Sequence, residues 1–176
     1  MGIFDSIKRK YGYDIKNRNY VAFAGRLSPE KGIPLLLEAA RKTPHIPYQL
    51  AGGMRDGYVE ELNLPKNVIL RGMLEPKELT IFYQKARFLV LTSIWYEGFP
   101  MVFPEAMANK LPILAPNMAG FPEIAEDNIN GLLFEVNNVD SLAAAIEKLW
   151  NDKELSCRLG ANGFEKVKEK YSQISY

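Results

Sequence analysis

Two glutamates, Glu97 and Glu105, stand eight residues apart around a glycine and two prolines. The apolar run 88–91 before them is typical of a buried strand, and the apolar segment after them is typical of a helix. Proline is tolerated only near the start of a helix, so we expect Glu105 close to a helix N-terminus and Glu97 in the preceding loop. The free N–H groups of such a terminus bind phosphate or hydroxyl oxygens. There, Glu105 can accept hydrogen bonds from paired hydroxyls, such as those of a ribose.

The same spacing has a simpler interpretation. Glu105 can complement the helix dipole, and Glu97 can be a solvated loop residue. A motif of two residues often matches by accident, so this spacing alone does not establish a site.

Arg26 and Lys31 form a second candidate group, in the glycine-bounded loop 25–32 after an apolar run. Arginine offers a bidentate fork and lysine a point charge, and together they can offset much of the charge of a pyrophosphate. The loop lacks the Walker pattern and Gly-x-Gly-x-x-Gly, which disfavours ATP hydrolysis and dinucleotide binding. Alternatively, both residues are surface charges beside Glu30. A sugar nucleotide would need a cationic loop and an acceptor for ribose hydroxyls at the same place.

The elements that must position these residues alternate along the chain. Short apolar runs typical of buried strands alternate with amphipathic segments, which predicts an α/β fold with a Rossmann-like parallel sheet flanked by helices. We expect strands at 20–24, 48–51, 67–70, 88–91, 112–115 and 132–134. We expect helices at 3–11, starting after 32, at 76–86, near 105, at 123–126, 141–150 and 153–170. The residues that follow 52–53, up to 63, form a polar segment.

Ligands of parallel sheets bind beyond the carboxyl ends of the strands. This rule selects the loops that leave those ends. They are 25–32, 52–53, 72–74, 92–102 and 116–123. Both candidate groups fall within this set, so we expect them at one edge of the sheet.

The composition is that of an ordinary globular protein. The chain has 176 residues and a formal net charge of +1, so we expect one substantial domain and no nucleic-acid partner. Its single cysteine and single histidine argue against an internal disulfide and a histidine metal site, and favour a reducing cytoplasm. We find no signal peptide and no membrane-spanning stretch. A basic cluster at 8–10 allows at most peripheral contact with the inner face of a membrane.

Several motifs in order resemble the C-terminal, donor-binding half of a retaining glycosyltransferase with the GT-B fold, of the kind classed as family 4. The resemblance starts near Tyr20 and divides the chain into a lead-in helix and connector, 1–19, and a Rossmann-like nucleotide-sugar-binding domain, 20–176. The motifs are Gly25-Arg26-(x4)-Lys31-Gly32, Glu97-Gly98-Phe99-Pro100-(x4)-Glu105-Ala106-Met107-Ala108, Ala119-Gly120-Phe121-Pro122-Glu123 and Asn130-Gly131.

The resemblance implies a role for each matching residue. Arg26 and Lys31, beside Gly25, would bind the donor diphosphate and stabilise its charge as the sugar leaves. Glu105 would bind the ribose hydroxyls. Glu97 would position the transferred sugar and, with Arg26 and Lys31, make up the catalytic set.

Backbone contacts complete the implied donor site. Gly98, Phe99 and Met101 would contact the sugar, and Met101 and Val102 would present N–H groups near the phosphates. The turn formed by Gly72, Met73 and Leu74 would border the base.

The implied reaction is hexosyl or N-acetylhexosaminyl transfer from a UDP- or GDP-sugar to a glycan or lipid-linked acceptor, as in polysaccharide biosynthesis. Anomeric configuration would be retained by a front-face mechanism, without a cofactor or bound metal. The acceptor-binding N-terminal domain would come from the same polypeptide or a separate chain, and this half would be inactive without it. Two other functions stay open: a non-catalytic nucleotide-sugar-binding module, and a sugar-nucleotide epimerase of the same fold.

Two positions depart from the pattern of this family. Lys110 stands where glycine is common after the helix that carries Glu105, and its backbone would be strained if that position is left-handed. Ala119 replaces the first glycine of a frequent pair, which could narrow the approach of the backbone to the donor.

Overall fold

The structure is a computed structural model that describes residues 15–94, 102–118 and 120–172. Its centre is a six-stranded sheet in the order β3-β2-β1-β4-β5-β6, and every neighbouring pair of strands is parallel. The strands are β1 (Tyr20–Ala24), β2 (Tyr48–Ala51), β3 (Val68–Gly72), β4 (Ala86–Val90), β5 (Ile113–Pro116) and β6 (Gly131–Phe134). The predicted Rossmann-like α/β fold is confirmed.

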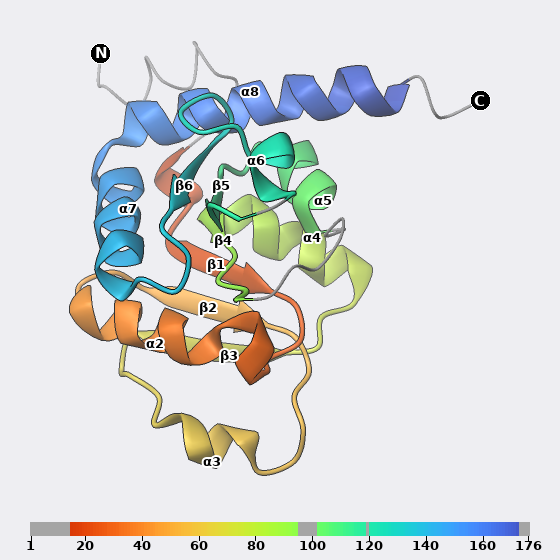
Figure 1. Cartoon of the computed structure of the whole chain (residues 1–176). Coiled ribbons are helices and arrows are strands. Elements are labelled where there is room, and N and C mark those ends of the chain that lie inside the picture. The colour runs from red at the N-terminus through yellow and green to blue at the C-terminus, as the bar shows by residue number, and fades with distance from the viewer. Residues whose placement is uncertain (1–14, 95–101, 119, 173–176) are drawn as a thin grey trace.

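Helices cover both faces of the sheet (Figure 1). One face packs against α2 (Ile33–Lys42) and α7 (Val139–Asn151), and the other against α4 (Pro76–Lys85), α5 (Val102–Ala108) and α6 (Phe121–Ile124). The remaining elements are η1 (Ile15–Asn17), η2 (Pro29–Lys31), α3 (Tyr58–Leu62) and α8 (Lys153–Ser172). The long α8 runs across one end of the molecule and contacts both α5 and α7.

Strand β1 shows why the central strands are almost entirely apolar. All five of its residues are buried. Val21 and Phe23 point into the core cluster under α2 and α7, whereas Ala22 and Ala24 point into the cluster under α4 and α5. Because successive side chains of a strand alternate between its faces, a strand covered on both sides reads as a continuous apolar run.

Three elements differ from the expectation. Residues 58–62 form the short helix α3 inside the segment expected to lack one; the buried Tyr58 and Leu62 explain it, since they share one face. Ala86, expected at the end of a helix, instead begins β4, where it pairs with Tyr20. Helix α6 lies at 121–124, two residues before its expected position, with Gly120 as its N-cap and a proline in its first turn. The expected helix at 3–11 lies outside the described residues.

Candidate functional site

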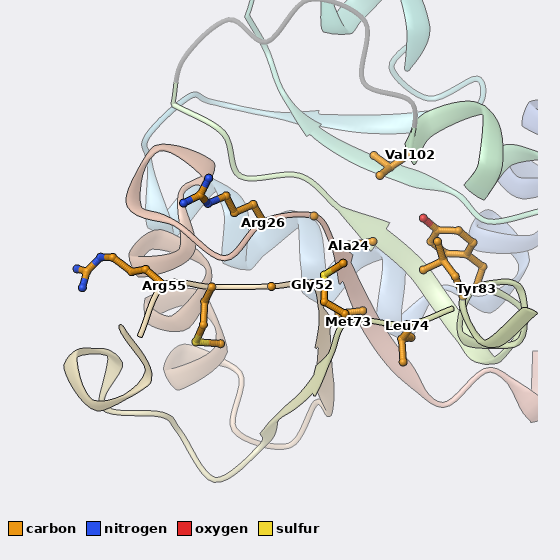
Figure 2. A pocket seen from close by; sticks show the side chains of 13 residues that line it. Ala24, Arg26, Gly52, Arg55, Met73, Leu74, Tyr83 and Val102 are labelled. Atoms are coloured by element: carbon orange, nitrogen blue, oxygen red, sulfur yellow. The ribbon is translucent and has the colours of Figure 1, made fainter. Parts of the chain in front are cut away.

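A cavity of about 610 Å³ opens at the carboxyl ends of β1, β2 and β3 (Figure 2). Ala24 and Ala51, the last residues of β1 and β2, line it together with the residues that follow them. Met73 and Leu74 line it after the end of β3, and Val102 lines it at the start of α5. The cavity therefore lies where ligands of parallel sheets bind.

The loops around the cavity extend the hydrogen bonding of the sheet. The Gly25 N–H donates to the Ala51 carbonyl at 3.0 Å, and the Gly52 N–H donates to the Gly72 carbonyl at 2.9 Å. Gly52 has a φ of +146°, and a Cβ built there would lie 1.7 Å from the Gly25 carbonyl oxygen. Only glycine allows the two loops to approach this closely, which leaves room for a ligand above them.

Arg26 and Lys31 are placed differently with respect to the cavity. Arg26 is exposed and lines it, whereas Lys31 is half-buried at the end of η2 and does not line it. The Lys31 carbonyl accepts a hydrogen bond from Thr92 Oγ1 at 2.8 Å, which holds η2 against the end of β4. Gly32 makes this contact possible, because a Cβ there would lie 1.8 Å from the Thr92 carbonyl oxygen.

Glu30 lies between these two cations in the loop. A hydrogen bond from its own backbone N–H is the largest cause that holds the pKa of the Glu30 carboxyl below its usual range, and the charges of Arg26 and Lys31 contribute less. The ionised Glu30 offsets part of the positive charge of the loop. A diphosphate bound there would interact with all three residues.

Glu105 is exposed in the first turn of α5, as its spacing from Glu97 and the prolines predicted. Its Oε2 accepts a hydrogen bond from the Tyr83 hydroxyl at 3.3 Å. Glu105 lines a second hollow of about 370 Å³, which shares Leu74, Leu79 and Tyr83 with the cavity. The two spaces therefore meet at Tyr83.

The turn after β3 supplies the apolar side of the cavity, as Figure 2 shows. The Met73 side chain is 79% exposed, and Leu74 is half-buried. A flexible thioether beside a leucine suits a flat, aromatic ligand group. Gly72 has a φ of +70° and ends the strand without lining the cavity itself.

Six of the named residues lie outside the residues that the structure describes. They are Glu97, Gly98, Phe99, Pro100, Met101 and Ala119.

Among the cavity residues that sequence reasoning missed are Tyr83 and Arg55. Tyr83 lies in the helix expected at 76–86, and its hydroxyl partner Glu105 is distant in the chain. Arg55 pairs with both carboxylate oxygens of Glu61, at 3.0 and 2.8 Å, and its guanidinium lies over the ring of Tyr58. The rule that ligands bind beyond the carboxyl ends of strands selected the loop at 52–53. Extending that loop by two residues would have included Arg55.

The described part of the chain contains no helix that is long and apolar enough to cross a membrane. Among the same residues, no three His, Cys, Asp or Glu side chains gather in a way that could hold a metal ion.

Three comparisons relate the chain to known proteins. It is 34% identical over 168 residues to an uncharacterized glycosyltransferase of Methanocaldococcus jannaschii, with 93% of this chain and 47% of that protein covered. A TarM variant of Staphylococcus aureus, solved in complex with fondaparinux, α-GlcNAc-glycerol and UDP, is 29% identical with a TM-score of 0.78, covering 90% of this chain and 34% of that one. A solved C-terminal domain of a group 1 glycosyl transferase from Francisella tularensis is 25% identical with a TM-score of 0.73. That match covers 93% of this chain and 92% of the other.

The chain thus spans less than half the length of the curated relative from M. jannaschii. It matches nearly the whole of a structure that is itself a C-terminal domain. The family model of glycosyl transferases group 1 matches residues 5–166. The chain therefore belongs to the glycosyl transferases group 1 family.

Proposed function

We propose that this chain is the donor-binding domain of a glycosyltransferase that uses a nucleoside-diphosphate sugar. The observation that carries the proposal is the distribution of charge around one apolar cavity. Arg26 lies on one side of the cavity and Tyr83 on the other (Figure 2), and the Tyr83 hydroxyl donates to Glu105, which lines the adjoining hollow. A nucleoside diphosphate bound in this cavity would direct its phosphates toward one side and its ribose hydroxyls toward the other.

Each part of the donor has a matching surface. The base would lie against Met73 and Leu74, which are apolar and border the cavity. The ribose hydroxyls would donate to Glu105, and the diphosphate would meet Arg26 at the mouth of the loop. The half-buried Lys31 would reach the diphosphate from the end of η2.

The proposed reaction breaks the bond between the sugar and the diphosphate. Arg26 and Lys31 would stabilise the charge that grows on the leaving phosphate, which is the role a metal ion plays in other transferases. We therefore propose transfer without a metal. Retention of configuration, Glu97 as the residue that positions the sugar, and contacts from Gly98, Phe99 and Met101 are proposed by resemblance to the family.

The acceptor site is proposed to lie on a second domain, in the same polypeptide or in a separate chain. The M. jannaschii relative is more than twice as long as the matched part, and the match with the F. tularensis structure is to a C-terminal domain. A hexose or N-acetylhexosamine as the sugar, and a glycan or glycolipid as the acceptor, are the proposed substrate classes; TarM was solved with α-GlcNAc-glycerol and UDP.

Calorimetric titration with UDP, GDP and their sugars, without added metal, tests the proposal. We expect one nucleotide to bind, and Arg26→Ala to weaken it about tenfold or more, because a charge-assisted hydrogen bond is lost. Glu105→Ala should weaken it as well. Lys66→Ala is the control, since Lys66 is exposed before β3 and does not line the cavity.

Two results would overturn the donor-site assignment: absence of binding by the parent chain, or equal binding by the parent, Arg26→Ala and Glu105→Ala. Acceptor turnover separates an enzyme from a binding module. We expect turnover only when an N-terminal domain is supplied, with a new glycosidic bond as the product. Free epimerised sugar would indicate an epimerase instead.

A further inference from the structure

The hydroxyl of Tyr83 is directed at the carboxylate of Glu105. Tyr83 lies near the end of α4 with only 1% of its surface exposed, and its hydroxyl donates to Glu105 Oε2 at 3.3 Å. In Figure 2 this hydroxyl lies on the side of Val102, where α5 begins. A buried residue of one helix thus holds the exposed carboxylate of another.

Tyr83 is buried, and both its ring and its backbone have partners. It packs against Phe82, at 6.0 Å between ring centroids, and its backbone carbonyl accepts a hydrogen bond from the Arg18 guanidinium at 3.3 Å. Glu105, by contrast, is exposed on a helix, where a long side chain would otherwise sample several rotamers. The hydrogen bond therefore restricts the more mobile partner.

Burial, and then the negative charge of Glu105, raise the pKa of the Tyr83 hydroxyl above its ordinary value. The hydroxyl consequently keeps its proton at neutral pH and acts as the donor in this pair.

We propose that Tyr83 is a positioning residue, whose hydroxyl fixes the Glu105 carboxylate in the orientation that accepts the ribose hydroxyls of the donor. This inference rests on the proposed function. The pair engages Oε2, so Oε1 would be the atom that accepts from the ribose, and Glu105 lines the hollow that meets the cavity at Tyr83. The ring also forms the wall where the cavity meets the hollow beside Glu105.

The test compares two ligands on the same chain. Calorimetry would measure the affinity of each variant for two ligands. One is the nucleoside diphosphate that the parent binds, and the other is its 2′,3′-dideoxy analogue, which lacks both ribose hydroxyls. We expect Tyr83→Phe to weaken the natural ligand about threefold to tenfold, the range of one hydrogen bond, and to leave the analogue within about twofold. In a Glu105→Ala background, Tyr83→Phe should have no further effect on either ligand.

Tyr20→Phe is the matched control. It also removes one buried tyrosine hydroxyl that bonds to α4, since Tyr20 donates to the Phe82 carbonyl at 2.7 Å. A general loosening of α4 would weaken both ligands in both variants, whereas positioning affects only the natural ligand in Tyr83→Phe.

Equal loss of both ligands in Tyr83→Phe, or no loss of either, overturns the positioning role while the donor site stands. Absence of nucleotide binding by the parent overturns the donor site and the positioning role together.

Discussion

Gly160 in α8 faces the backbone carbonyl of Lys110, and a Cβ at position 160 would lie 2.2 Å from that oxygen. The carbonyl belongs to the turn between α5 and β5. Since α5 carries Glu105, the close approach of α8 supports the helix on which the proposed ribose contact depends. The glycine in the middle of a helix, ordinarily unfavourable, is explained by this contact.

Gly160→Ala should therefore destabilise the fold. A backbone oxygen cannot move aside as a side chain can, so we expect a loss of about 1–3 kcal/mol in the free energy of unfolding. Gly163→Ala is the matched control on the same helix, because its Cβ would lie 3.4 Å from the Met107 side chain. There we expect no loss, or a gain of up to about 1 kcal/mol from helix propensity. Urea unfolding measures both, and equal effects would contradict the steric explanation.

Lys110 has a left-handed backbone with a φ of +58°. A residue with a Cβ is strained there, and a glycine is not. Lys110→Gly should stabilise the protein by about 0.5–1 kcal/mol. This gain is the relieved strain minus two losses: the entropy that glycine costs, and the contact of Lys110 Nζ with the ring of Phe164. Lys110→Ala loses that contact but keeps the strained backbone, so a gain in this variant as well would refute the account.

The fold could be predicted largely because β1, β4 and β5 are buried along their whole length. The apolar run Tyr20–Ala24 predicted β1 with its observed ends, and the run Tyr48–Ala51 predicted β2. The sequence-based limit of α4 was wrong at Ala86, because alanine suits a helix as well as a buried strand. Pairing with Tyr20 decided that position, and such pairing is not visible in a local pattern.

The site could be predicted only where its residues are close in the chain. The position of Glu105 at the start of α5 followed from its prolines, and the placement of the loop after β1 followed from its glycines. The contact of Tyr83 with Glu105 joins residues 22 positions apart, and only the packing of α4 beside α5 brings them together. The half-buried position of Lys31, away from the cavity, was also not foreseeable from the loop.

Arg18 joins the ends of two helices and should contribute strongly to stability. It is 5% exposed, and its guanidinium donates to the carbonyls of Tyr83, Ala86 and Asn109, at 3.3, 3.2 and 2.7 Å. Arg18→Ala leaves these carbonyls without that donor, so we expect a loss of about 2–4 kcal/mol in the free energy of unfolding. The control is Lys16→Ala, an exposed residue of the same segment, with an expected change within about 0.5 kcal/mol. Similar melting temperatures for the two variants would contradict this role.

Glu30 should weaken the binding of anionic ligands. Its carboxylate interacts with the charges of Arg26 and Lys31, the two cations that we propose bind the donor diphosphate. Glu30→Gln removes the competing charge, and we expect nucleoside diphosphates to bind about twofold to fivefold more tightly at low salt. The gain should shrink at high ionic strength, because this interaction is exposed to solvent. Glu165→Gln, an equal change of charge on α8, should leave affinity unchanged; a gain there would point to net charge rather than to the loop.

Alkaline pH should destabilise the fold through its buried tyrosines. Burial is the largest cause that raises the pKa of Tyr20 from 10.0 to about 12, and the charges of Arg71 and Arg18 offset it only in part. The folded state therefore holds a proton that the unfolded chain releases. The stabilisation is complete below pH 10 and falls as the pH rises from 10 towards 12.

Urea unfolding at several pH values in this window measures the effect. Tyr20→Phe should give a shallower fall than the parent, and Tyr48→Phe should do the same, since burial also raises the pKa of the Tyr48 hydroxyl. The slopes are compared rather than the absolute stabilities, because each variant also loses a hydrogen bond, to the Phe82 carbonyl and to Thr43 Oγ1 respectively. If both variants followed the slope of the parent, the alkaline loss would have to come from groups other than these two tyrosines.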